Sequence, residues 1–150
     1  MRPRLMVTAL SFVLLSLPAV AQPTWDLVTP KEEARDRAVP HRAGPAGVPA
    51  SPLIHLLRPD ISRPIRNPTT IEVRFSAGPG AAINMQSFKA TYGWIGLNIT
   101  SRLLRHARKT RDTLLAQNVD LPPGDHKVTL SISTTLGQIA TRTFRFSVAQ

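Results

Sequence analysis

The chain has 150 residues and no cysteine, and its 19 Lys and Arg against 9 Asp and Glu give a formal net charge of +10 at pH 7. The absence of cysteine excludes disulfides, thiol chemistry and cysteine-ligated metal sites. The length limits the chain to a single small domain. A protein this basic is attracted to anionic polymers, acidic lipid headgroups or nucleic acid if it meets them.

The first 21 residues have the pattern of a secretory signal peptide. Two arginines precede an apolar stretch over residues 5–17, and residues 19–21 read Ala-Val-Ala, the small residues that a signal peptidase requires. The apolar stretch is too short to span a bilayer, which needs about 20 residues. We therefore predict cleavage before Gln22 and a soluble exported protein, periplasmic or secreted, with no membrane span.

Residues 22–52 have the composition of a flexible tail or linker. Prolines recur among Ala and Gly, so the segment buries too little apolar surface to offset its ordering entropy. Residues 31–37 suit two helical turns, but an isolated helix of this length is at best transient. Trp25 is the exception in this tail, and it either docks on the domain or serves as an exposed anchor for a partner.

From residue 53 onward, apolar and polar residues alternate, which is typical of half-buried β-strands. No long amphipathic helix lies between the alternating stretches. The pattern predicts an all-β domain over residues 53–150, an antiparallel two-sheet sandwich of about seven strands. Strands are expected near 53–57, 71–75, 88–92, 95–99, 113–118, 127–133 and 143–148, with turns at 77–80, 121–125 and Gly137.

Residues 100–117 fit two different structures. Either Thr100 or Ser101 is a suitable cap for a helix whose apolar side holds Leu103 and Leu104. Residues 114–116 equally suit a strand before the Pro-Pro-Gly turn. We expect a short helical turn near 101–108, followed by a strand near 113–118.

Residues 102–111 carry a run of basic side chains that no acidic residue interrupts. On a helix, residues 102, 105, 106 and 109 would share one face, and on a loop the side chains would fan outward. Either arrangement suits phosphate or carboxylate groups, whereas the lack of interleaved aromatics argues against nucleic acid. The competing interpretation is a solvated loop. The predicted binding residues are Arg102, Arg105, His106, Arg108, Lys109 and Arg111.

No pattern in the chain predicts catalysis, a metal site or a cofactor. The histidines at 41, 55, 106 and 126 form neither i, i+4 pairs nor acidic clusters, and Asp125-His126 is explained by a turn followed by a strand. Neither a Gly-x-Ser-x-Gly nor a Ser-x-x-Lys motif occurs. We therefore expect a protein that is not an enzyme. Strand parity places Tyr92 in the core, and Trp94 is either a core residue or a lid over the sandwich edge.

Several motifs resemble those of bacterial immunoglobulin-like exported domains of the E-set type, over residues 53–149. They are prolines at 59, 64 and 68, Ile-x-Val-x-Phe-Ser at 71–76, Leu-Pro-Pro-Gly-Asp-His at 121–126, and Phe-x-Phe-x-Val at 144–148. The layout is also distantly similar to the periplasmic CopC-like copper carriers, which place a His at the mature N-terminus and Asp-Gly-His near the last hairpin. Those positions here are Gln22 and the Thr-Thr-Leu-Gly-Gln of 134–138, so the resemblance does not extend to copper binding.

These features together predict a non-enzymatic binding or structural module of the bacterial cell envelope. It would meet an anionic polymer or a protein partner through residues 102–111, with an exposed strand edge as a further contact surface. The alternative is a periplasmic metal-carrier or metal-stress protein of the CopC-like type.

Overall fold

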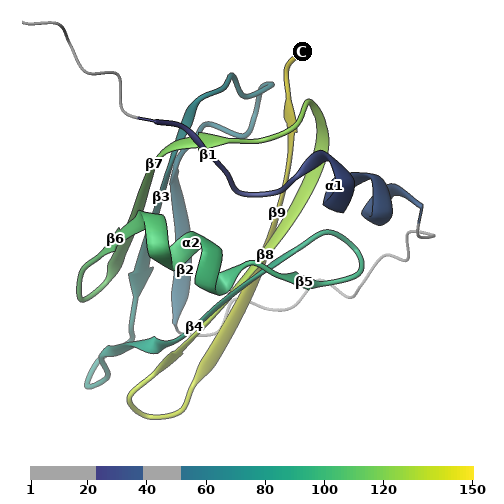
Figure 1. Ribbon diagram of the computed structural model, residues 1–150. Coiled ribbons are helices and arrows are strands. Elements are labelled where there is room, and N and C mark those ends of the chain that lie inside the picture. The colour runs from purple at the N-terminus through teal and green to yellow at the C-terminus, as the bar shows by residue number, and fades with distance from the viewer. Residues whose placement is uncertain (1–22, 39–51) are drawn as a thin grey trace, which may run out of the picture.

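The computed structural model describes residues 23–38 and 52–150 as two β-sheets packed face to face (Figure 1). The all-β sandwich predicted from the alternating pattern is confirmed. The signal peptide prediction for residues 1–21 and the tail prediction for residues 39–51 lie outside the described residues. Within the described residues, no helix is long and apolar enough to cross a membrane.

The first sheet contains five strands, and one of them comes from the N-terminal segment. They are β1 (Trp25–Asp26), β2 (Leu53–Arg58), β3 (Thr69–Ser76), β6 (Ala107–Lys109) and β7 (Thr113–Asp120). Their order is β1-β7-β3-β2, and β6 also pairs with β7. β1 runs parallel to β7, whereas the other pairs are antiparallel.

The second sheet is antiparallel throughout, in the order β5-β4-β8-β9. Its strands are β4 (Ile83–Tyr92), β5 (Leu97–Asn98), β8 (Gly124–Thr134) and β9 (Ile139–Val148). β8 and β9 stay in register from Gly124 opposite Val148 to Ser133 opposite Ile139. This long pairing fixes which side chains of the two strands share the outer face of the sheet.

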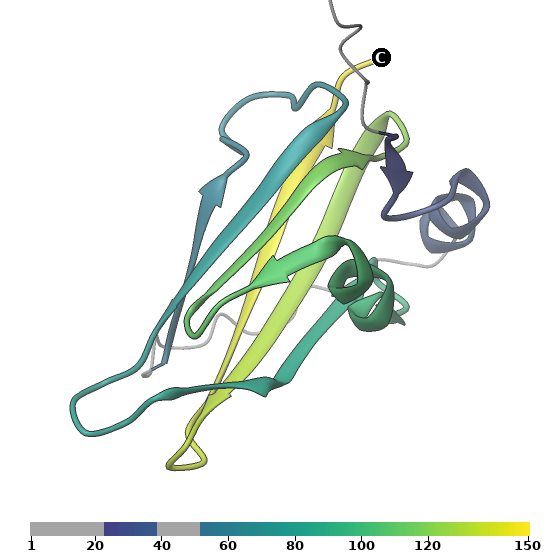
Figure 2. The same ribbon diagram turned by 60° about the vertical axis from the view of Figure 1, so that its left-hand side comes forward.

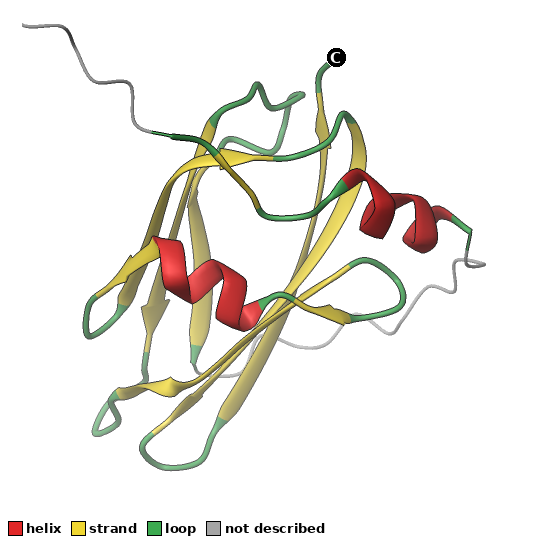
Figure 3. Cartoon of the chain, in the orientation of Figure 1, coloured by secondary structure: helices red, strands yellow, loops and turns green. Residues whose placement is uncertain are grey.

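Two short helices complete the fold, α1 (Pro30–Arg37) and α2 (Thr100–His106). In Figure 2 both lie to the right of the strands, on the side where β1 crosses, and Figure 3 marks them in red. α1 has a complete capping box: the Thr29 hydroxyl accepts the backbone N–H of Glu32, and the Glu32 carboxylate accepts the backbone N–H of Thr29. Proline begins the helix, which is a position where it costs no hydrogen bond.

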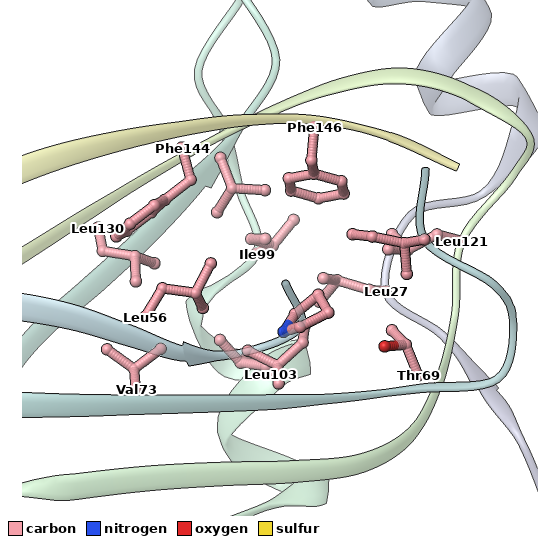
Figure 4. Close-up of a pocket in the computed structure, with 14 residues that line it drawn as sticks. Leu27, Leu56, Thr69, Val73, Ile99, Leu103, Leu121, Leu130, Phe144 and Phe146 are labelled. Atoms are coloured by element: carbon pink, nitrogen blue, oxygen red, sulfur yellow. The ribbon is translucent and has the colours of Figure 1, made fainter. Parts of the chain in front are cut away.

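The core lies between the sheets and is filled from both inner faces. Val73 and Phe75 of β3 are buried on one side, and Leu130 and Ile132 of β8 on the other. A cavity of about 40 Å³ remains between the two sheets (Figure 4). Among the described residues that line it, Thr69 is the one with a polar side chain. A water needs several polar partners to occupy such a space, so this cavity is a dry packing gap rather than a polar ligand site.

Residues 23–38 correct the prediction of a flexible tail for this part of 22–52. They form β1 and α1, and Leu27 and Val28 are 1% and 0% exposed in the main core. Burying two such side chains contributes about 1.5–3 kcal/mol each. The helix predicted to be transient is stable because the domain binds it, and we call residues 23–38 the N-terminal strap.

The strand expected at 95–99 is also corrected. Ile95 lies in a turn after Gly93 and is 48% exposed, and β5 is only Leu97–Asn98. The Asp36 carboxylate of α1 accepts the backbone N–H groups of both Trp94 and Ile95. The turn therefore depends on a residue that the local alternation cannot reveal.

Candidate functional site

The helical turn and strand predicted for residues 101–118 are confirmed, but the predicted cap is wrong. The Thr100 hydroxyl bonds to β4 instead, because it accepts the N–H of Ala90 at 2.9 Å and donates to its carbonyl at 3.2 Å. Asn98 accepts the backbone N–H of Thr100 at 3.0 Å. These bonds anchor the start of α2 to the second sheet.

The predicted basic face of a single helix is not formed. α2 ends at His106, and the next residues continue as β6, which pairs with β7. Arg108 lies opposite Leu115, and Lys109 opposite Leu114. Successive residues of a strand point to opposite faces, so these two cations diverge.

Arg102 is an internal structural contact rather than a free binding residue. Its guanidinium bonds both carboxylate oxygens of Glu32 at 2.8 Å and the carbonyl of Leu27 at 2.9 Å. The hydrogen bond from Arg102 is the main cause that lowers the pKa of Glu32 to about 2. The guanidinium of Arg102, one of the predicted binding residues, is therefore already occupied within the fold.

His106 stacks on Trp25, with ring centroids 4.4 Å apart and planes inclined by 13°. The indole N–H of Trp25 donates to the carbonyl of Gln117 at 2.9 Å. Trp25 thus docks on the domain, which was one of its two predicted roles. The stacked rings line a surface hollow of about 430 Å³ together with Arg108. Sequence reasoning missed this pairing because the two rings lie on distant segments.

Four of the predicted cations remain exposed around the corner formed by α2, β6 and the turn into β7. None of the four makes an ion pair with any residue that the structure describes. The nearby Asp112 accepts hydrogen bonds from the hydroxyls of Thr110 and Thr113. We define the α2–β6 cation cluster as Arg105, Arg108, Lys109 and Arg111.

Histidines are not brought together in the described part of the chain. His55 lies in β2, His106 ends α2, and His126 is buried in β8. The Nε2–H of His126 donates to the Pro122 carbonyl at 2.7 Å, and Nδ1 accepts from the Tyr92 hydroxyl at 2.8 Å. Burial lowers the pKa of His126, so the neutral ring is favoured.

Metal ligation gains no support from these positions. Residues 23–38 and 52–150 contain no group of three or more His, Cys, Asp or Glu side chains arranged to hold a metal ion. Both ring nitrogens of His126 are already hydrogen-bonded. The metal-carrier alternative stays a prediction, which equilibrium dialysis with copper and zinc tests.

Comparisons with known proteins give one structural match. No protein-family model and no curated protein sequence matches the chain. The fold is similar to that of CopC from Methylosinus trichosporium OB3b, at 15% sequence identity and a TM-score of 0.41, over 65% of this chain and 94% of that chain. A match at this level carries no inference about ligands or activity.

Proposed function

We propose that this protein is an exported, non-enzymatic binding module of the bacterial cell envelope. Its ligand is an anionic polymer, which it holds on the α2–β6 cation cluster. The observation that carries the proposal is the exposure of four cations within residues 105–111, none of which forms an ion pair among the described residues. The pattern of the first 21 residues supports export.

The distribution of acidic residues supports the same conclusion. Glu32 and Glu33 pair with Arg102 and Arg37, and Asp36 bonds backbone N–H groups. Three of the four strap carboxylates are thus used within the fold, and no ion pair joins the strap to the cluster. Arginine contributes a planar donor fork that bonds carboxylate or phosphate in bidentate fashion, and three of the four cations are arginines.

The test is binding of the chain from Gln22 to immobilised polygalacturonate, with neutral dextran as the reference polymer. We expect retention to fall as the salt concentration rises from about 50 to about 300 mM. The Debye length then shrinks below about 10 Å, so the attraction between the exposed cations and the polymer is screened. The quadruple variant R105Q/R108Q/K109Q/R111Q should elute from the polymer at lower salt than the parent chain.

The matched control is K31Q/R35Q/R63Q/R66Q, which removes the same charge elsewhere on the surface. Glutamine is polar, and all eight substituted positions are exposed, so neither variant is expected to unfold. Equal loss of retention in the two variants would show that net charge alone binds the polymer, and the proposal would be wrong. Retention of the chain on neutral dextran would overturn it as well.

A further inference from the structure

Two cations and an indole meet on the outer face of the second sheet, away from the α2–β6 cation cluster. Lys127 of β8 and Arg145 of β9 are directly opposite in the antiparallel pair. The ammonium of Lys127 lies 3.8 Å from the ring centroid of Trp94, and the guanidinium carbon of Arg145 lies 5.3 Å from it. Like charges directly opposite each other destabilise a sheet, and here the indole attracts both cations.

The fold holds Trp94 firmly at this position. Its backbone N–H donates to the carboxylate of Asp36, which is buried beneath the turn. Gly93 precedes it with φ of +74°, and a side chain there would overlap the same carboxylate. The indole is therefore placed by the strap and the turn together, as a preorganised ligand contact requires.

A surface hollow of about 690 Å³ lies at this point and includes Trp94, Lys127 and Arg145 in its lining. Two acidic residues also line it. Asp36 is occupied by backbone N–H groups, and the exposed Asp125 lies at the start of β8, opposite Ser147. The volume is sufficient for a short oligosaccharide, since ligand pockets span roughly 300–1,000 Å³.

The sheet face that continues from the hollow is rich in hydroxyl groups. Thr91, Thr129 and Thr143 form one row across β4, β8 and β9, and the hydroxyls of Thr129 and Thr143 lie 2.9 Å apart. Ser131 and Thr141 form part of the next row, with hydroxyls 3.3 Å apart. Between residues 126 and 148 the sequence has no acidic residue. The face thus offers donors and acceptors to a hydroxylated ligand and positive charge to an anionic one.

We propose that this face is a second binding site, and that its ligand is an acidic oligosaccharide. A sugar carboxylate lies between Lys127 and Arg145, where it relieves their repulsion, and sugar hydroxyls bond the threonine row. An indole beside the site supplies the apolar contact that a pyranose ring requires. A single carboxylate or phosphate ion held by the two cations is too small to contact the indole and the threonine row at the same time, because Thr129 lies two residues along β8 from Lys127. The ligand class follows from this combination of groups.

Isothermal titration of the chain from Gln22 with trigalacturonate tests the proposal, with maltotriose as the neutral trisaccharide and inorganic phosphate as the simple anion. We expect saturable binding of trigalacturonate only. The variant K127Q/R145Q should weaken it ten-fold or more, because two charge-assisted hydrogen bonds are lost. The control K31Q/R35Q removes equal charge from exposed positions of α1 and should bind as the parent does.

Two further measurements locate the ligand. In a W25F variant Trp94 is the sole tryptophan, and its fluorescence should change with the same midpoint as the calorimetric titration. T129V/T143V should weaken trigalacturonate several-fold, since valine keeps the shape and removes the hydroxyls. Phosphate binding as tight as trigalacturonate, equal binding of maltotriose, or no effect of K127Q/R145Q would each overturn the proposal. The α2–β6 quadruple variant should retain this binding, so the two proposals fail separately.

Discussion

Arg102 of α2 and Glu32 of α1 form a two-pronged ion pair in which both oxygen–nitrogen distances are 2.8 Å. The side chains are 31% and 19% exposed, so the pair is screened less than a surface pair. A double-mutant cycle with R102Q and E32Q should give a coupling energy of about 1–2 kcal/mol in urea unfolding. A coupling energy near zero would show that the contact does not hold the strap.

Leu27 tests whether the strap belongs to the cooperative unit of the domain. Because Leu27 is 1% exposed in the core, L27A should reduce the free energy of unfolding by about 2–5 kcal/mol. The control is L136A, at a leucine that is 65% exposed, which should change it by less than about 0.5 kcal/mol. If the two variants were equally stable in urea, the strap would unfold independently of the sandwich.

Gly93 and Gly96 provide a matched pair of glycines, with φ of +74° and +70°. G96A should cost about 1 kcal/mol, since its surroundings within 4 Å are open and only the backbone conformation opposes a side chain. G93A should cost clearly more, because a methyl group there overlaps the Asp36 carboxylate. Thermal unfolding of both variants measures the difference, and equal melting temperatures would contradict the close approach.

His126 makes stability depend on pH near neutrality. Burial lowers the pKa of this histidine below its ordinary value of 6.5, so only the unfolded chain takes up the proton as pH falls through 6.5. The free energy of unfolding should therefore decrease as the pH is lowered from about 7.5 to about 5. The H126Q variant should show a weaker dependence of this free energy on pH. A slope unchanged in H126Q would assign the effect to other groups. The charged groups that act on the ring are Glu33, Arg37 and Asp125.

Glu32 should make stability depend on pH in the acid range. Its pKa is lowered from 4.5 to about 2 in the folded protein, mainly by Arg102, so its stabilising contribution is complete above pH 4.5. That contribution is lost as pH falls toward 2, because the carboxyl is then protonated in both states. E32Q should show a shallower acid transition, and R102Q should show the same change. Acid unfolding followed by circular dichroism measures both.

The two-sheet fold could be predicted because its longest strands alternate cleanly. In β8, Val128, Leu130 and Ile132 all face the core, as their spacing indicates. The strap was missed although its sequence carries a signal, since Thr29, Pro30 and Glu32 match a capping box with proline at the first helical position. Composition outweighed that local signal, and the burial of Leu27 depends on surfaces far away in the chain.

The candidate site was only partly predictable for a similar reason. A run of basic residues shows how much charge is present, but not which cations are already paired. Glu32 is 70 residues from Arg102, and the fold alone brings them together. The same limit applies to Trp94, which the alternation left as either core or lid and whose contacts with Lys127 and Arg145 arise from strand register.

The parallel pairing of β1 with β7 also affects when the domain can finish folding. Leu27 donates its backbone N–H to the backbone carbonyl of Asp120, and Arg37 donates to the carbonyl of Pro123. The first described residues therefore find their partners about 90 residues later in the sequence. Such distant contacts slow folding. While the chain is being synthesised, Leu27 and Val28 emerge long before the surfaces that bury them. The N-terminal strap is therefore expected to fold late, although it comes early in the described sequence.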